Sequence, residues 1–207
     1  MIEKIEQEIG CFFDECAKQG FMESFSEEEL PKLKEALKRW DIRPGQHILE
    51  PGCGSGRLTE YLSRAVDAEG EVYACDISTE MIRLARKRSL PGNVMFVQAS
   101  VNSIPREDNF FDSVICFQVF PHFTDQTRSL SEIARVLKPR GNLRIEHFKS
   151  RDTINSVHKE ASGVIVSHII PPDEKMRRLL NRTGFEVVGI QDSPQRYCVH
   201  AVKIKFC

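Results

Sequence analysis

The sequence lacks an excess of one charge and lacks any long apolar run. Its 29 basic residues nearly cancel 30 acidic residues among 207, which leaves a net charge of −1. A protein that binds long nucleic acids by neutralising phosphates has a clear basic excess, so we expect no nucleic-acid partner. A membrane span needs about 20 consecutive apolar residues, which no part of the chain supplies. The first residues also lack the apolar segment of a signal peptide, so the expected location is cytoplasmic.

Closely paired cysteines are absent as well. The seven cysteines are an odd number, and no two of them are separated by just two residues. A structural zinc site needs closely paired ligands at a recognisable spacing, and a disulfide framework normally uses an even set of cysteines. We therefore expect reduced, mostly buried thiols and no structural metal.

The spacing of apolar residues changes near residue 45. Before that point, apolar side chains recur at helical spacing from Leu33 to Trp40, behind a capping box formed by Ser26 and Glu29. The segment from Ile5 to Lys18 has the pattern of another amphipathic helix. The chain is long enough for one substantial core. We predict a single domain in which residues 1–44 form helices that cover a cleft and residues 45–207 form the main unit.

From residue 46 onward, short apolar runs alternate with helical stripes. Strands separated by helices imply right-handed crossovers and a parallel sheet. The last two strands are joined by the short polar segment 191–196, and a connection that short requires an antiparallel pair. We predict an α/β, Rossmann-like, seven-stranded and mostly parallel sheet with helices on both faces and an antiparallel last strand. The predicted strands cover residues 47–49, 72–75, 94–97, 113–117, 143–145, 185–190 and 197–206.

Two connections in this pattern are distinctive. A helical stripe from Leu130 to Leu137 is followed by Gly141, which we interpret as the residue that stops the helix. The segment from Lys149 to Pro172 has no clear period, and we expect a long irregular loop there. Loops of that length in compact domains are usually functional.

A glycine-rich turn joins the first predicted strand to the helix that follows. Glu50 comes near the end of the strand, and Gly52, Gly54 and Gly56 then provide a backbone that a ligand can approach closely. Dinucleotide binding prefers G-x-G-x-x-G, whose third glycine would stand where this chain has Arg57. The spacing here is G-x-G-x-G. A turn of this kind by itself is weak evidence for any ligand.

Together with later segments, this turn resembles the first motif of class I S-adenosylmethionine-dependent methyltransferases. The resemblance extends from about residue 45 to 205, and it is greatest to the small-molecule branch, including the ubiquinone/menaquinone-biosynthesis type. Arg140 departs from the family's R-V-L-K-P-G-G turn because it replaces the first glycine. The matching segments are the acidic residue and glycines at 50–56, Y-A-C-D-I-S at 73–78, F-D-S-V-I at 111–115, I-A-R-V-L-K-P-R-G at 133–141 and T-G-F-E-V-V at 183–188.

The resemblance implies S-adenosylmethionine as the cofactor and S-adenosylhomocysteine as its product. The loop that contains Gly52, Cys53, Gly54 and Gly56 is then expected to face the methionine part of the cofactor. Glu50 is expected to orient the ammonium of that part, directly or through water.

The nucleoside part has its own expected contacts. Asp76 matches the residue that accepts hydrogen bonds from the ribose hydroxyls, and Ile77 and Met81 match apolar walls for adenine. After the third strand the family usually has an acidic or amide residue that accepts from the adenine amino group. Ser100 stands there in this chain, and the backbone of Val101 could share the contact. A neutral hydroxyl predicts a contact weaker by roughly 1 kcal/mol.

Candidate residues for the chemistry follow the fourth and fifth strands. Gln118 lies where the family contacts the ammonium, often through a backbone carbonyl. His122 and His147 are the candidate catalytic residues, as a general base or as contacts to the methyl acceptor, because the carboxyl ends of parallel strands face the crevice. His122 could instead cap the next helix or pack against it. Glu146 should point away from His147 if the strand is regular.

Other side chains could complete the acceptor end. His158 and His168 could join His147 in a metal-binding or proton-handling cluster. Their spacings match no metal-ligand motif, and no metal is assigned. Three phenylalanines, at positions 12, 13 and 21, could close the pocket from the N-terminal side.

The predicted function is methyl transfer from S-adenosylmethionine to a small-molecule acceptor by in-line displacement. This reaction requires alignment of the nucleophile, the methyl group and sulfur, and no metal is intrinsically required. Two alternatives stay open: a catalytically silent subunit that binds the cofactor, and a nicotinamide-dependent oxidoreductase, which Arg57 disfavours. The sequence does not identify whether oxygen, nitrogen, carbon or sulfur is methylated. A homodimer is compatible with the sequence, which does not decide the oligomeric state.

Overall fold

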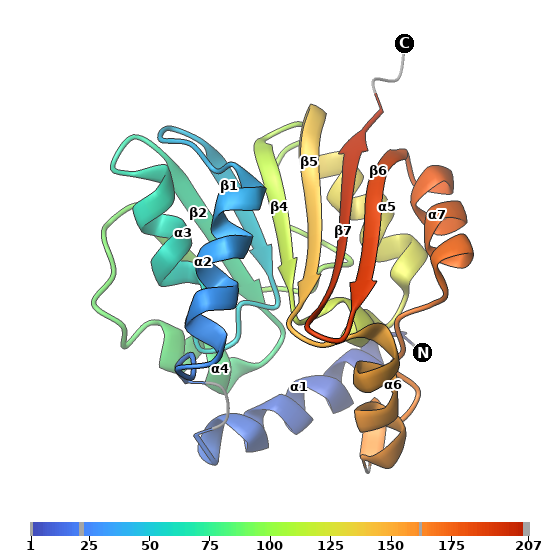
Figure 1. Cartoon of the computed structure of the whole chain (residues 1–207). Coiled ribbons are helices and arrows are strands. Elements are labelled where there is room, and N and C mark those ends of the chain that lie inside the picture. The colour runs from blue at the N-terminus through green and yellow to red at the C-terminus, as the bar shows by residue number, and fades with distance from the viewer. Residues whose placement is uncertain (1, 21–22, 162, 205–207) are drawn as a thin grey trace.

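The computed structural model describes residues 2–20, 23–161 and 163–204, and at its centre is a seven-stranded sheet (Figure 1). The strand order is β3-β2-β1-β4-β5-β7-β6. Strand β7 runs antiparallel to β5 and to β6, and the other neighbours are parallel. The predicted Rossmann-like sheet with a reversed last strand is confirmed. The strands are β1 (His47–Pro51), β2 (Glu71–Asp76), β3 (Val94–Gln98), β4 (Phe111–Phe117), β5 (Leu137–His147), β6 (Phe185–Ser193) and β7 (Arg196–Lys203).

Helices pack on both faces of this sheet because its central strands are apolar on both sides. Ile48 and Val72 belong to a core cluster that includes side chains of α2 and α3, whereas Leu49 and Tyr73 belong to a cluster with side chains of α5 and α7. Side chains alternate along a strand, so strands covered on both faces have near-continuous apolar runs. The helices are α1 (Ile2–Lys18), α2 (Glu29–Trp40), α3 (Thr59–Val66), α4 (Thr79–Ala85), α5 (Gln126–Val136), α6 (Arg151–Glu160) and α7 (Asp173–Arg182).

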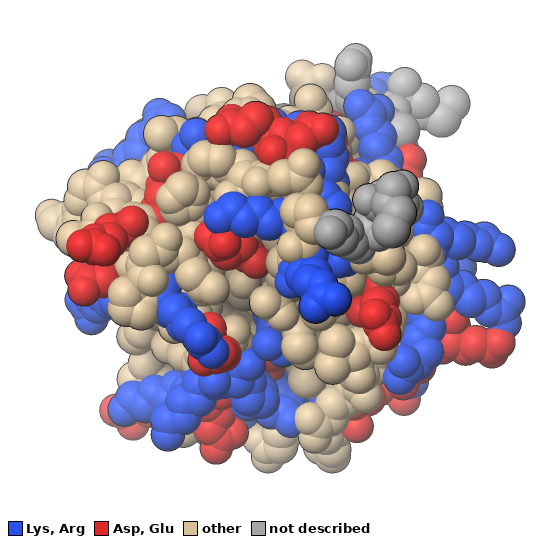
Figure 2. All heavy atoms as spheres, turned by 90° about the horizontal axis from the view of Figure 1, so that it is seen from above, with Lys and Arg blue, Asp and Glu red and all other residues tan. Residues whose placement is uncertain are grey.

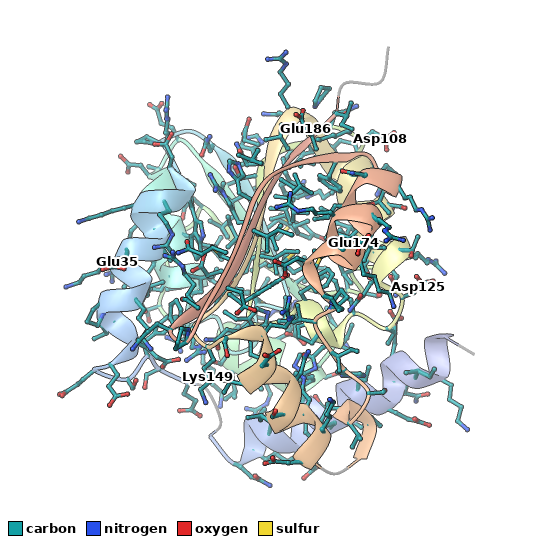
Figure 3. All side chains as sticks on the ribbon, turned by 45° about the vertical axis from the view of Figure 1, so that its right-hand side comes forward. Glu35, Asp108, Asp125, Lys149, Glu174 and Glu186 are labelled. Carbon is teal, nitrogen blue, oxygen red and sulfur yellow. The ribbon has the colours of Figure 1, made fainter. Side chains whose placement is uncertain are left out.

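Two of these helices lie at the carboxyl ends of the parallel strands. In Figure 1, α1 runs across this edge of the sheet, and α6 lies beside it. α1 packs against α4 and against the short 3-10 turn Gly163–Ile165. Lys149 marks the point where the chain leaves β5 and enters α6 (Figure 3). The edge where a parallel α/β sheet binds its ligands is therefore covered by these two helices.

The capping box before α2 forms as predicted. The backbone N–H of Glu29 donates to Ser26 Oγ at 3.2 Å, and the N–H of Ser26 donates to Glu29 Oε2 at 3.0 Å. These reciprocal bonds satisfy two donors that the first helical turn leaves without partners. The α-helix begins at Glu29, three residues after Ser26, with Pro31 in its first turn.

Gly141 does not stop the helix that precedes β5, contrary to the prediction. Helix α5 ends at Val136, and Leu137 already pairs with Phe111 of β4. Residues 138–141 fall in a register shift between β4 and β5, where Arg140 has a φ of +64°. A Cβ on Gly141 would lie 2.7 Å from Leu137 Cγ. The glycine is therefore needed for a bulge that folds back on the start of the strand.

The predicted irregular loop between Lys149 and Pro172 is also wrong, because it contains α6. Ser150 is the N-cap of this helix, and its Oγ accepts from the N–H of Thr153 at 3.2 Å. Ile154 is the one buried residue of α6. A helix with so little buried apolar surface leaves a weak period in the sequence. At the chain's end, the predicted antiparallel hairpin is present, but β7 ends at Lys203 and Phe206 lies outside the described residues.

The surface carries charges of both signs, as the composition indicates, but the cysteines are less buried than expected. On the face turned away from α1, basic and acidic side chains are interspersed (Figure 2). None of the described helices is long and apolar enough to cross a membrane. The described cysteines are all free thiols, but half of them are not buried, against the expectation of mostly buried ones. Cys53, Cys75 and Cys116 are buried, Cys16 and Cys198 are half-buried, and Cys11 is exposed.

Candidate active site

A cavity of about 760 Å³ lies at the carboxyl edge of the parallel strands. This volume falls within the roughly 300–1,000 Å³ typical of small-molecule sites. Its walls come from the loops after β1, β2, β3 and β4, from the end of β5, and from α1 and α6. Every residue predicted to contact the cofactor or the acceptor lines it, except Gly56. Phe12 and Phe13 of α1 also line it, and Phe21 lies outside the described residues.

The three glycines of the loop after β1 all have positive φ, as the turn requires. The angles are +67° at Gly52, +54° at Gly54 and +78° at Gly56. A Cβ on Gly52 would meet Val119 Cγ2 at 2.1 Å, and one on Gly56 would meet the Phe96 ring at 3.0 Å. At Gly54 a Cβ would have no neighbour closer than 3.9 Å. Gly52 and Gly56 thus allow the loop to pack on the protein, and Gly54 leaves room on the cavity side.

Glu50 is a buried carboxyl group next to this loop. It is 2 % exposed, and its Oε2 accepts a hydrogen bond from Thr59 Oγ1 at 2.6 Å. Burial, with a smaller contribution from nearby Asp76, raises the pKa of Glu50 to about 8. The carboxyl is therefore mostly protonated at pH 7 and would ionise if a cation were placed beside it.

Asp76, at the end of β2, is held by backbone donors on both of its oxygens. The N–H of Gly54 donates to Oδ2 and the N–H of Ser78 donates to Oδ1, each at 2.9 Å. Burial raises the pKa of Asp76, and the backbone donors oppose that effect. Ser78 also caps α4, because its Oγ accepts from the N–H of Met81 at 3.0 Å. Ser78 thereby helps to position both the carboxylate of Asp76 and the start of the helix that contains Met81.

Gln118 follows β4 with a φ of +54°, which is uncommon for a residue with a side chain. Its N–H donates to the carbonyl of Glu146 at 2.8 Å, and its Oε1 accepts from Arg57 Nη2 at 2.6 Å. The Arg57 guanidinium is 4.4 Å from the centroid of the Phe25 ring and ion-pairs with Glu29 at 3.4 Å. Sequence reasoning did not assign Arg57 to the site. Its position directly after Gly56, the last glycine of the loop, could have indicated that this charged residue lies at the site.

Ser100, after β3, has its hydroxyl group engaged by protein groups. Its Oγ donates to Glu6 Oε1 at 2.5 Å and accepts from the N–H of Asn102 at 3.0 Å. Val101 is next to it and is buried in the cavity wall. Glu6 belongs to α1 and also lines the cavity, and no sequence pattern pointed to it.

Histidines gather at the other end of the cavity. His122, His147 and His158 line it, and the Nδ1 atoms of His122 and His168 are 3.0 Å apart and share a hydrogen bond. The ring of His158 lies 4.9 Å from that of His122, and Phe13 packs edge-on against His122 at 5.1 Å. Among the described residues, no group of three His, Cys, Asp or Glu side chains is placed to hold a metal ion.

His147 differs from its neighbours because its Nε2 is buried without a hydrogen-bond partner in the described part of the chain. Burial lowers the pKa of His147 to about 3 and that of His168 to about 4, and it also lowers the pKa of His122. All three imidazoles are therefore neutral at pH 7. Glu146 points to the opposite side of β5, as expected, where Arg39 and Trp40 donate to its carboxylate at 2.7 and 3.3 Å.

Comparisons with known proteins agree with this geometry. A family model for a methyltransferase domain matches residues 49–145. The ubiquinone/menaquinone biosynthesis C-methyltransferase UbiE of Idiomarina loihiensis is 30% identical over 177 residues, which cover 73% of this chain and 70% of that protein. The chain belongs to the class I S-adenosylmethionine-dependent methyltransferase family. The cofactor of this family is S-adenosylmethionine.

Other relatives match over a smaller share of their length. The UbiE protein of Yersinia pestis is 35% identical over 134 residues, which cover 63% of this chain and 53% of that protein. The UbiE protein of Vibrio cholerae is 34% identical over 155 residues, which cover 70% of this chain and 58% of that protein. The methyltransferase chain therefore spans little more than half the length of these two relatives.

Solved structures share the fold. A SAM-dependent methyltransferase from Aquifex aeolicus superposes with a TM-score of 0.71 at 24% identity, covering 86% of this chain and 94% of that one. The [4+2]-cyclase SpnF superposes with a TM-score of 0.68 at 20% identity, covering 84% of this chain and 81% of that one. A fold common to a methyltransferase and a cyclase does not decide the reaction, which must be argued from the site.

The residues of the cavity fit the family's cofactor. Next to the loop, the carboxyl of Glu50, which ionises when a cation lies beside it, suits an ammonium group, and the fixed carboxylate of Asp76 suits a pair of hydroxyl groups. The side chains of Ile77 and Met81 provide an apolar wall after β2. Gly54 leaves the adjoining backbone accessible.

Proposed function

We propose that this methyltransferase chain transfers the methyl group of S-adenosylmethionine to a small molecule bound at the histidine end of the cavity. The observation that carries the proposal is that a single cavity extends from the glycine loop and Asp76 to His122 and His147. Its volume of about 760 Å³ suits a cofactor with a compact acceptor, and α1 and α6 cover it.

At the cofactor end, three groups of this chain have distinct tasks. Asp76 accepts hydrogen bonds from the ribose hydroxyls, and its two backbone donors prevent it from turning away. Glu50 releases its proton when an ammonium group lies beside it, because the positive charge offsets the desolvation that raises its pKa. Gln118 is held by Arg57, so its backbone carbonyl is fixed at the loop's edge. When bound, S-adenosylmethionine supplies an electrophilic methyl group on a sulfonium that departs as a neutral thioether.

At the acceptor end, His147 and His122 serve as neutral hydrogen-bond partners that orient the nucleophile. A general base works best when its pKa is near the operating pH, and the pKa of His147 is about 3. Its buried Nε2 has no partner among the described residues, and because His147 lines the cavity, a rotation of the ring would bring this nitrogen to an acceptor. His122 is fixed by its hydrogen bond to His168. Alignment of the acceptor is therefore their main contribution.

The test has a binding stage and a transfer stage. S-Adenosylhomocysteine should bind and raise the melting temperature, whereas NAD should not, because ligands that bind the folded state stabilise it. Methyl transfer from labelled S-adenosylmethionine is then measured with an acceptor panel. The first acceptors to test are quinone precursors, because the named relatives act in ubiquinone and menaquinone biosynthesis. Phenols, thiols and amines of similar size are tested next.

Each outcome is informative. His147→Asn and His122→Asn should reduce turnover by about 10-fold or more and leave the affinity for S-adenosylhomocysteine unchanged, because they act on the acceptor. Binding of the cofactor without transfer to any acceptor would support a cofactor-binding subunit instead. Failure to bind S-adenosylhomocysteine would overturn the proposal.

A further inference from the structure

Helix α1 brings a carboxylate to the nucleoside end of the cavity. Glu6 Oε1 accepts hydrogen bonds from Ser100 Oγ at 2.5 Å and from Asn102 Nδ2 at 2.7 Å, in the loop after β3. Within the described residues, the second oxygen of Glu6, Oε2, accepts no hydrogen bond. Glu6 is half-buried and lines the cavity, as do Ile77 and Ser100. A residue far away in the sequence therefore supplies a negative charge next to the position that the neutral Ser100 occupies.

The neighbouring polar groups are largely engaged by other partners. Ser100 donates its one hydroxyl proton to Glu6 and accepts from the N–H of Asn102, which leaves a single neutral acceptor lone pair on its oxygen. The side-chain oxygen of Asn102 accepts from Ser129 Oγ at 2.7 Å, and its amide nitrogen donates to Glu6 and to Thr124 Oγ1. Among these groups, Glu6 Oε2 is the charged acceptor without a partner.

Resting on the proposed function, we infer that Glu6 recognises the amino group of the adenine ring. An exocyclic amino group has two N–H donors, and a carboxylate is the strongest acceptor a side chain can offer them. The cavity wall beside Glu6 is apolar at Ile77, Ala99 and Val101, which suits a flat base. Helix α1 is then a cover that contacts the cofactor itself, so the base of the cofactor stabilises the covered state.

A second contact attaches α1 to the rest of the fold without lining the main cavity, so attachment of the helix can be tested separately from recognition of the base. Asp14 Oδ1 accepts from Ser78 Oγ at 2.6 Å and from the N–H of Glu80 at 3.0 Å, at the start of α4. Asp14 does not line the main cavity. Weakening this contact should loosen α1 without changing which base is preferred. Glu6 should affect the preference itself.

The experiment compares two ligands by calorimetry: S-adenosylhomocysteine and S-inosylhomocysteine, in which a carbonyl oxygen replaces the amino group. The natural chain should prefer the adenine ligand by at least about tenfold, because a carboxylate repels the carbonyl oxygen and accepts from the amino group. In Glu6→Gln the preference should fall below about threefold, because a neutral amide can turn to donate or to accept. Circular dichroism and the melting temperature check that this variant folds.

Two variants serve as controls. Glu8→Gln removes the same charge from an exposed position on α1 and should keep the natural preference. Asp14→Asn should lower the affinity for both ligands by the same factor. An unchanged preference in folded Glu6→Gln would overturn the inference, and so would an equal loss for both ligands. If the natural chain does not bind S-adenosylhomocysteine at all, the proposed function fails first, so the two failures are distinguishable.

Discussion

The glycines of the loop after β1 limit substitution in different ways. At Gly52 a methyl group would overlap Val119, and the residue already has a φ of +67°. Overpacking and left-handed strain together should destabilise Gly52→Ala by about 2–4 kcal/mol, measured by chemical denaturation. Val119→Ala in the same chain should recover part of that loss. An unaltered free energy of unfolding in Gly52→Ala would contradict the packing described for this loop.

Gly54→Ala should behave in the opposite way. Its φ of +54° costs about 1 kcal/mol for an alanine, but the nearest neighbour of the added methyl group would be Met81 Sδ at 3.9 Å, and Gly54 lines the cavity. Stability should therefore fall by only about 1 kcal/mol, and the affinity for S-adenosylhomocysteine should fall by about 10-fold or more in calorimetry, because the backbone can no longer approach the ligand. Equal affinity in the variant would show that the cofactor does not contact this part of the loop.

Glu50 links protonation to both folding and ligand binding. Its pKa of about 8 in the folded chain exceeds the ordinary 4.5, so the fold favours the protonated form. The unfolded chain ionises first, and the free energy of unfolding therefore falls as pH rises from about 4.5 to 8. Glu50→Gln should stabilise the ligand-free protein at pH 8 by about 1–3 kcal/mol, seen as a higher melting temperature. The same change should do nothing at pH 4.

The same residue gives a prediction for calorimetry of S-adenosylhomocysteine. If Glu50 ionises beside the ligand's ammonium, binding at pH 7 releases a proton, and the measured enthalpy depends on the ionisation enthalpy of the buffer. Affinity should then rise with pH up to about 8. Both effects should disappear in Glu50→Gln, along with about 10-fold of affinity. A buffer-independent enthalpy in the natural chain would remove Glu50 from the ammonium site.

Residue placement could be predicted from the sequence where the signal is local. Asp76 and Glu50 lie at strand ends on either side of one glycine loop, so their spacing alone puts them at the same edge of the sheet. The contacts of Glu6 and Arg57 could not be predicted in this way. The hydrogen-bond partners of Glu6 are Ser100 and Asn102, which lie 94 and 96 residues further along the chain, and Arg57 bonds to Gln118. The spacing of apolar residues carries no information about such distant pairs.

At the scale of elements, α2 is attached to β5 by a buried charge. Glu146 is 3 % exposed in its side chain, and burial raises its pKa against the opposing effect of Arg39. Arg39→Met should destabilise the fold by about 1–3 kcal/mol at pH 8, since among the described residues it leaves the carboxylate with Trp40 as its hydrogen-bond donor and Arg196 as a favourable charge. The loss should shrink as the pH is lowered, because the carboxyl, whose pKa is already raised by burial, can then take up a proton. Adding Glu146→Gln should restore most of the stability, and a pH-independent loss would contradict this account.

Elements were predictable where they bury an apolar stripe. Helix α5 packs Leu130 and Ile133 into the core and shows a clear period, whereas α6 buries Ile154 alone. Helix α6 lies against the cavity and is held by polar contacts. Asn155 Nδ2 donates to the carbonyl of Ile170 at 2.9 Å, and the N–H of Ile170 donates to Asn155 Oδ1 at 2.8 Å. A helix stabilised by such distant bonds leaves little trace in its own hydrophobic pattern.

At the scale of the whole molecule, the framework was more predictable than the cover, of which the sequence indicated α1 but not α6. The sheet and its flanking helices follow from alternating periods of two and 3.6 residues. The cover is formed by α1 and α6, and we expect it to determine which molecule enters the cavity. It contacts the framework through buried apolar side chains such as Ile9 and Ile154, and through individual polar bonds such as those of Asp14 and Glu6. Acceptor identity is consequently the property that the sequence leaves open, and the acceptor panel addresses it directly.

Buried titratable groups of both kinds should give the whole molecule a stability maximum between about pH 6 and 7. Folding lowers the pKa of His147 to about 3, of His168 and His200 to about 4, and lowers that of His122 as well. Below their ordinary value of 6.5 the unfolded chain binds these protons first, so the free energy of unfolding falls as pH falls.

Glu50 acts in the opposite direction, because its raised pKa lowers stability as pH rises towards 8. Four histidines outweigh this carboxyl below pH 6, and the carboxyl dominates above pH 7, when the histidines are neutral in both states. Urea denaturation from pH 4 to 9 should show the resulting dome. In His147→Gln the acidic side should become shallower while the basic side stays as it was. A stability that keeps rising above pH 7 would mean that Glu50 is ionised in the folded chain.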